Sequence, residues 1–156
     1  MKMKSQSEVV ALVSIAALTI ALVSTAYFWG IPLIEKRQDS IKADRARDMF
    51  DIGNLNSLPS KIEKSIKFSS REDFTSNVDG TWMFNGSENS LSFKFLSKAS
   101  NIALKEDVGG WISIYETCSN DTGTCKNNMG TFGKDKPFCI CAFAERVVDR
   151  YSITYK

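Results

Sequence analysis

The feature that most constrains this chain is a run without any charged side chain from Val9 to Ile34, 26 consecutive positions in a sequence of 156 residues. As an α-helix this run is about 39 Å long, whereas about 20 apolar residues suffice to cross the hydrocarbon core of a bilayer. A helix that is apolar on every side needs lipid or other helices around it. The sequence therefore predicts a membrane-spanning or bundle-core helix near its start.

The charges that flank the run predict its orientation. Lys2 and Lys4 precede it, and a segment of mixed sign, residues 35–39, follows it. Basic residues tend to stay on the cytoplasmic side of a membrane. We therefore expect the N-terminus in the cytoplasm and everything after Ile34 outside.

A small residue recurs at every fourth position of the run, at Ala17, Ala21 and Thr25. Residues four apart share one face of a helix, and small side chains there let two helices in lipid approach closely. The stripe predicts a helix-packing face, although alanine is also simply common in membrane helices.

The helical pattern continues beyond the run, with a change of character. Gly30 and Pro32 predict a kink or a local unwinding near the end of the first helix, which covers residues 6–36. An amphipathic extension of the helix follows over residues 37–56. The extension has one apolar side, which requires a partner surface.

Residues 57–156 change from helical to strand periodicity. Ser57 and Pro59 are typical of a helix start and predict a short helix to about Phe68. Alternating apolar residues then predict strands, two of which flank a turn at residues 85–89 and form a hairpin. The predicted strands are 81–84, 91–95, 111–115, 138–148 and 151–155. We expect an antiparallel sheet or sandwich with one buried face, and thus an α+β fold with a globular domain over residues 57–156.

All four cysteines lie late in the chain, at Cys118, Cys125, Cys139 and Cys141. An even number in a small exported domain indicates disulfides. Zinc is the alternative, but C-x6-C-x13-C-x-C is not a usual ligand spacing and the chain has no histidine, so we expect no metal. A bridge between residues only two apart would be strained, so Cys139 and Cys141 should each pair with Cys118 or Cys125, in either order.

Two further features lie in polar stretches. The N-x-S/T sequences that begin at Asn85 and Asn120 are candidate N-glycosylation sites in an exported domain. About twenty residues between Cys118 and Pro137 lack a regular pattern, which predicts a functional loop or a disulfide-tied excursion.

The residues form no recognisable catalytic pattern. Without histidine there is no Ser-His-Asp or Cys-His arrangement, and no glycine-rich phosphate-binding motif occurs. The lysines are dispersed rather than clustered, which is untypical of nucleic-acid binding. We expect neither an enzyme nor a bound cofactor, and no nucleic-acid partner.

A short basic leader, a small residue, a few polar residues, an apolar helix and a C-terminal β domain together resemble the type IV pilin superfamily in its archaeal form. The stretch from Gln6 to Leu12, QSEVVAL, is similar to the signal Q-x-S-x-E-x-x-x-L, with single residues missing between Gln, Ser and Glu. The E-x-x-x-L part, which begins at Glu8, keeps its spacing. The resemblance covers residues 1 to about 40.

In that family a membrane-embedded prepilin peptidase cuts before the apolar helix on the cytoplasmic side. The resemblance implies a leader of residues 1–5, a cut between Ser5 and Gln6, and a helix that is kept. It also implies that Glu8 pairs with the freed amine of a neighbouring subunit, although Glu8 would be the third mature residue rather than the fifth. Otherwise Glu8 lies among lipid headgroups.

The function implied by the resemblance is structural. The chain would be a major or minor subunit of a surface filament, held in the membrane until the pilus assembly machinery packs its helix against copies of itself or other pilins. The alternative is an uncut single-pass anchor at the cell surface, whose outer domain binds a cell-wall layer, a glycan or a protein.

Overall fold

The computed structural model describes residues 3–115, 118–126, 130–132 and 136–156. The chain divides into two compact units, Met1–Arg37 and Gln38–Lys156. One α-helix, α1 (Met3–Asp48), supplies the whole of the first unit and the beginning of the second.

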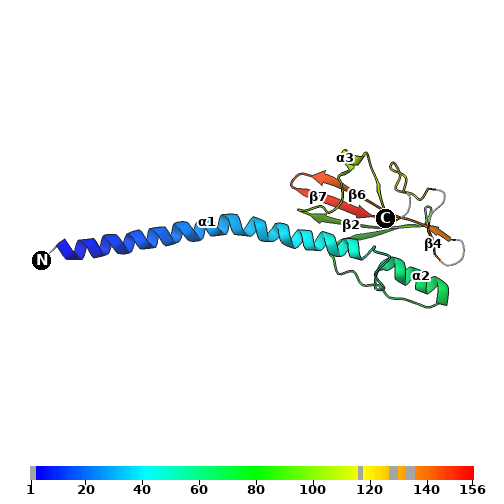
Figure 1. Ribbon diagram of the computed structural model, residues 1–156, viewed down its shortest axis with the longest axis horizontal. Coiled ribbons are helices and arrows are strands. Elements are labelled where there is room, and N and C mark those ends of the chain that lie inside the picture. The colour runs from blue at the N-terminus through cyan, green and yellow to red at the C-terminus, as the bar shows by residue number, and fades with distance from the viewer. Residues whose placement is uncertain (1–2, 116–117, 127–129, 133–135) are drawn as a thin grey trace. The chain divides into compact units, whose positions relative to one another are not determined.

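The first unit is an uninterrupted helix (Figure 1). The hydroxyls of Ser14, Thr19 and Thr25 each donate to the carbonyl four residues earlier, at 2.7–2.8 Å, so they need no water. Pro32 lies inside α1, and the helix does not unwind there, so the unwinding alternative at Gly30 and Pro32 is wrong, while the kink stays a prediction. A proline removes one hydrogen bond, and the turns on either side of Pro32 keep theirs.

The second unit is built on a five-stranded antiparallel sheet with the order β1-β2-β7-β6-β3. The fold class predicted from the sequence, an α+β chain with an apolar N-terminal helix and an antiparallel sheet, is confirmed. The predicted hairpin is formed by β1 and β2. The strands are β1 (Thr81–Asn85), β2 (Ser90–Ser97), β3 (Ile112–Tyr115), β6 (Ile140–Val147) and β7 (Arg150–Tyr155).

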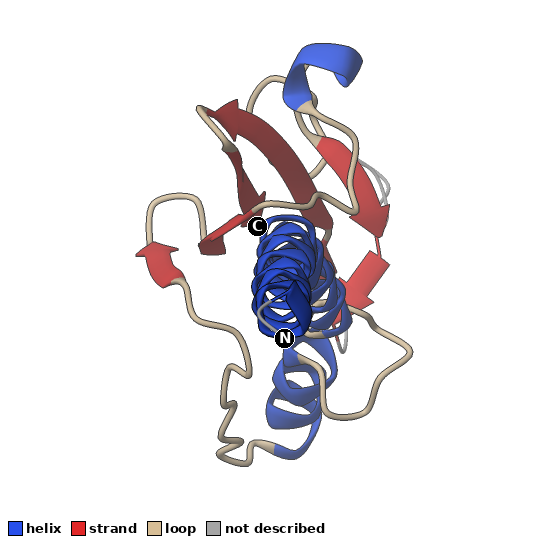
Figure 2. Ribbon diagram, turned by 90° about the vertical axis from the view of Figure 1, so that its left-hand side faces the viewer, coloured by secondary structure: helices blue, strands red, loops and turns tan. Residues whose placement is uncertain are grey.

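The remaining elements are short. The helix α2 (Leu58–Phe68) starts as predicted, with Ser57 in an extended conformation before it and Pro59 in its first turn. The four-residue α3 (Lys105–Val108) precedes β3, and α2 and α3 lie on opposite sides of the second unit (Figure 2). A separate two-stranded ladder joins β4 (Gly130–Phe132) to β5 (Lys136–Phe138).

The core lies between one face of the sheet and the end of α1. In the register, Tyr155 pairs with Phe93 on one side and Ala142 on the other, and Ile153 pairs with Phe95 and Ala144 in the same way, so these side chains share one face. The apolar side of the amphipathic extension packs against them. Its buried residues are Ala43, Ala46, Met49 and Phe50. The partner surface that the pattern required is therefore the sheet of the same chain.

The opposite face of the sheet is covered in part. Trp111 packs edge-on against Phe143, with ring centroids 4.3 Å apart, and Phe143 is the register partner of Thr154. Ser152 and Thr154 are buried on this side, and their hydroxyls have no hydrogen-bond partner among the described residues. The sequence predicted one buried face, but around Ser152 and Thr154 of β7 the second face is buried as well.

Candidate functional site

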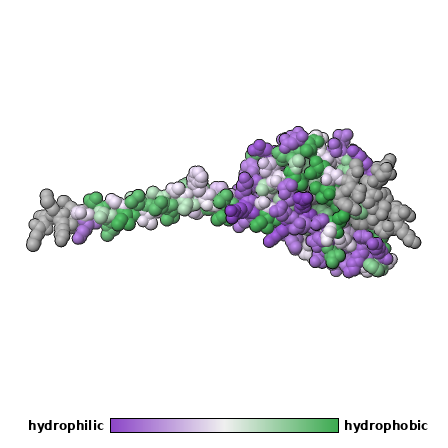
Figure 3. Space-filling model, in the orientation of Figure 1, coloured by the Kyte–Doolittle hydropathy of each residue, from purple (hydrophilic) through white to green (hydrophobic). Residues whose placement is uncertain are grey.

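The first candidate site is the bare surface of the apolar helix. Among the described residues, α1 contains the one segment long and apolar enough to cross a membrane, and an 18-residue window of it has a mean hydropathy of 2.4 with no residue buried. Hydrophobic side chains follow one another along this part of the helix in Figure 3. Such a helix near an N-terminus is suited to membrane insertion or to an export signal.

Aromatic side chains gather near the end of the apolar run. Tyr27, Phe28 and Trp29 are all exposed, Trp29 to 81%, and the rings of Tyr27 and Phe28 meet edge-on with centroids 6.5 Å apart. Tyrosine and tryptophan are enriched where a membrane meets water, because one edge of the ring can stay wet. This placement favours the membrane-spanning interpretation.

The small-residue stripe is free for contact. Ala17, Ala21 and Thr25 are exposed, and nothing in the described part of the chain covers them. The Thr25 hydroxyl donates to the Ala21 carbonyl at 2.8 Å, so the stripe presents no unsatisfied donor to a neighbouring helix. Its role in packing stays a prediction, because a single chain contains no second helix of this kind.

The predicted processing site lies at the very start of α1. Ser5 and Gln6 belong to its first turns, but their side chains lie outside the described part of the structure. Glu8 is exposed and forms no ion pair with any described side chain. The cut after Ser5 and the pairing of Glu8 therefore remain predictions.

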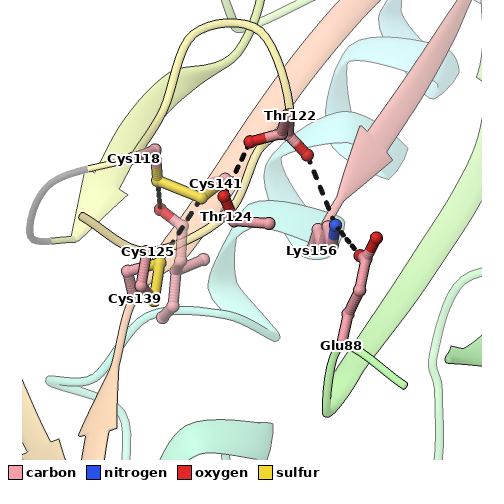
Figure 4. Close-up of a disulfide and its surroundings, with 9 residues drawn as sticks. Glu88, Cys118, Thr122, Thr124, Cys125, Cys139, Cys141 and Lys156 are labelled. Carbon is pink, nitrogen blue, oxygen red and sulfur yellow. Dashed lines mark hydrogen bonds and ion pairs between the residues drawn. A yellow bond between two sulfur atoms is a disulfide. The ribbon is translucent and has the colours of Figure 1, made fainter. Parts of the chain in front are cut away.

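The second candidate site is the end of the sheet where the cysteines lie (Figure 4). Cys118 pairs with Cys141, and Cys125 pairs with Cys139, with Cα–Cα distances of 5.8 and 5.5 Å. The prediction that Cys139 and Cys141 each pair back to an earlier cysteine is confirmed, and the structure supplies the order that the sequence left open. The Sγ atoms of Cys118, Cys139 and Cys141 lie within 4.8 Å of one another, but each is oxidised.

The segment between the first two cysteines is a tied turn. Cys118 and Cys125 form a β-bridge, and the Ser119 amide donates to the Thr124 carbonyl at 2.8 Å. The Trp111 amide donates to the Asn120 carbonyl at 2.8 Å, which fastens the turn to β3. The disulfides tie this part as one of the two alternatives predicted, the functional-loop alternative stays a prediction, and β4 and β5 add regular structure that the sequence pattern missed. Residues 127–129 and 133–135 lie outside the described residues.

Both candidate glycosylation sites are exposed. Asn85 ends β1, and its Oδ1 accepts hydrogen bonds from the Ser87 amide and hydroxyl at 3.1 and 2.6 Å. Asn120 lies in the tied turn, two residues before Thr122, whose hydroxyl shares a hydrogen bond of 2.6 Å with that of Thr124. Attachment of sugar at Asn85 or Asn120 stays a prediction.

An apolar cleft of about 650 Å³, here named the α2 cleft, lies beside this end of the sheet. One wall is α2, with Leu58, Ile62 and Ile66, and the other is formed by residues 88–91 and the Cys125–Cys139 bridge. At its rim Lys156 Nζ lies 2.7 Å from Glu88 Oε2 and 5.8 Å from the Trp111 ring. Sequence reasoning missed the cleft, and the spacing of Ile62 and Ile66 on one helical face was the only signal for it.

No protein-family model, curated protein or solved structure matches this chain. Its own architecture, an exposed apolar helix followed by a disulfide-bonded antiparallel sheet, is pilin-like.

Proposed function

We propose that this chain is a structural subunit of an archaeal type IV pilus-like surface filament. The observation that carries the proposal is one α-helix with two environments. Its first part leaves every residue from Val9 to Thr25 exposed, and its last turns are anchored in the core of a compact domain. A helix fastened at one end to a folded domain can enter a bundle of identical helices without unfolding that domain.

The small-residue stripe supplies the contact between helices. Moving an apolar helix from lipid into a helical bundle gains little from the hydrophobic effect, because lipid tails are as apolar as leucine. Close packing must supply the free energy instead, and small side chains allow it. Ala17, Ala21 and Thr25 are where we place that packing.

Processing after Ser5 prepares the chain for this assembly. Removing residues 1–5 takes away two lysines and no acid, so the formal net charge falls from +2 to 0. Copies without net charge pack together without strong mutual repulsion. The new amine of Gln6 and the carboxylate of Glu8 would then be the charges available for pairing between neighbours.

The partners in this proposal are copies of the chain or other pilins, a prepilin peptidase, the assembly machinery and the membrane. The two disulfides favour an extracytoplasmic position for the sheet domain, because disulfides persist in oxidising compartments.

Intact-mass measurement of the full chain from membranes and from sheared surface filaments tests the proposal. We expect the mass of a chain that begins at Gln6. Ser5→Trp, in which a bulky side chain replaces the small residue, should not be processed. Ser5→Ala is the matched control and should be cut normally. A chain that still begins at Met1 in both fractions would refute the proposal.

The alternative function, an uncut surface anchor, is favoured by one observation. Glu8 lies two residues earlier than the glutamate of the full signal, since single residues are missing on both sides of Ser7. The same mass measurement separates the two functions, because the anchor keeps residues 1–5 and is absent from sheared filaments.

A further inference from the structure

The turn between β6 and β7 carries two exposed valines, Val147 and Val148, here named the valine tip. Val148 is 91% exposed and has a φ of 57°. A β-branched residue in this left-handed region is a rare outlier, with a strain of roughly 1–3 kcal/mol. The chain thus holds an apolar side chain in water on a strained turn, which gives no benefit to the isolated fold.

The charges around the valine tip bear on what it contacts. Glu145 and Asp149 are exposed, as are Arg146 and Arg150, so the two acids balance the two bases. An apolar turn that inserts into an anionic membrane is expected to carry an excess of basic residues. A balanced turn is better suited to a protein surface.

The α2 cleft offers such a surface within the same unit. Its lining includes Ile62, Ile66, Leu91 and Ile140, which suits an apolar side chain. Its wall also includes Ser90, whose buried Oγ has no hydrogen-bond partner among the described residues.

The valine tip and the α2 cleft lie at opposite ends of the same two strands. Val147 pairs with Arg150 at one end of the β6–β7 ladder, and Ala142 pairs with Tyr155 near the other. Ile140, which lines the cleft, is seven residues from Val147, or about 24 Å along a strand. Figure 1 shows the β6–β7 turn at the far end of the second unit from β4.

A protrusion and a cavity at opposite ends of one rigid sheet cannot meet within a chain. They can meet between successive copies, as a head-to-tail contact that repeats without closing unless its rotation forms a ring. We infer that the valine tip of one copy docks in the α2 cleft of the next. This inference rests on the proposed filament function, to which it adds a second contact between subunits.

Photo-cross-linking in cells that produce the full chain tests the docking. A benzophenone amino acid at position 148 should give light-dependent dimers and a ladder of higher species. The cross-linked peptides should contain residues 58–66 or 88–91 of another copy. The same probe at Val108, an exposed position on α3 outside both surfaces, should give at least tenfold less dimer.

A second variant tests the cleft side. Ile66 is 40% exposed, so Ile66→Arg should leave the fold intact while it places a charge in the cleft. In the chain with the probe at position 148, we expect Ile66→Arg to lower the dimer yield at least tenfold, and Val108→Arg to leave it unchanged.

The strained backbone at Val148 allows a test that separates docking from a role in the stability of the fold. Val148→Gly removes the apolar side chain and relieves the strain at positive φ. It should therefore raise or preserve the melting temperature while it lowers the yield of dimers trapped by a cross-linker at Ile62. If Val148→Gly gives the same dimer yield as the unchanged chain, the docking is refuted.

The failure of the docking and the failure of the filament function give different results. If the chain keeps Met1 and forms no filaments, yet the probe at position 148 reaches the α2 cleft of another copy, the contact stands and the filament function fails. If filaments form while the probe reaches lipid, an unrelated protein, another surface or nothing, the docking is overturned.

Discussion

Tyr155 has a pKa that folding shifts clearly. It is buried between Phe50, with ring centroids 4.9 Å apart, and Phe95, at 6.5 Å. Its hydroxyl donates to Asn101 Oδ1 over a long 3.5 Å. Burial is the main reason that the pKa of Tyr155 is raised to about 12.

This pKa predicts a loss of stability in alkali. The folded state keeps a proton that the unfolded chain loses near pH 10, so the stabilisation is complete below pH 10 and is lost as the pH rises towards 12. The difference between the pKa of about 12 in the folded state and 10.0 in the unfolded chain corresponds to about 3 kcal/mol. Urea unfolding between pH 9 and 12 should show this fall, and Tyr155→Phe should make the curve flatter. Equal slopes in both proteins would refute the assignment.

Gly123 is the residue on which the tied turn depends. Its φ is 58°, and a Cβ at this position would fall inside the indole of Trp111. We expect Gly123→Ala to lower the free energy of unfolding by about 1–3 kcal/mol, because it adds both strain and a clash. Gly86→Ala is the control, since its Cβ would meet only Phe84 at an ordinary 3.5 Å. Thermal unfolding of the two variants checks the difference.

At the scale of the element, α1 is one helix with two kinds of surface. Phe28 lies on the bare part, whereas Phe50 follows the last turn and stacks on Tyr155 with an angle of 10° between the rings. The hydrophobic pattern of the sequence predicted both the apolar run and the amphipathic extension, because helical periodicity is visible within a few turns. It did not predict what covers the extension.

These two phenylalanines give a matched pair of truncations. We expect Phe50→Ala to destabilise the sheet domain by about 3–5 kcal/mol, because it opens a cavity between α1 and the sheet. Phe28→Ala should leave the unfolding of that domain unchanged. Near-ultraviolet circular dichroism during urea titration of both full-length variants measures the effect. A similar loss in both would mean that Phe50 is not part of the core.

At the scale of the whole molecule, the compact sheet domain begins inside a helix. The second unit starts at Gln38, and the first residue of its buried core is Ala43. Asp39 also contacts the chain just after β2, since its Oδ2 accepts a hydrogen bond from the Lys98 amide at 2.6 Å. The domain of residues 57–156 predicted from the sequence therefore lacks part of the core it packs against.

This boundary predicts how fragments behave. Residues 38–156, produced under oxidising conditions, should unfold cooperatively at nearly the melting temperature of the full chain's sheet domain. Residues 57–156 lose Ala43, Ala46, Met49 and Phe50, and should not fold cooperatively. Circular dichroism melting curves decide between the two. Equal stability of both fragments would show that the end of α1 is dispensable.

Elements whose signals are local could be predicted from the amino-acid sequence. The apolar helix, the start of α2 and the hairpin around residues 85–89 are each specified by residues that lie within a few turns of one another. The pairing of Cys118 with Cys141, the burial of Phe50 and the α2 cleft became known from the fold alone. Each of these depends on contacts between segments far apart in the chain, and the free energy of such contacts is set by packing and loop closure rather than by local preference.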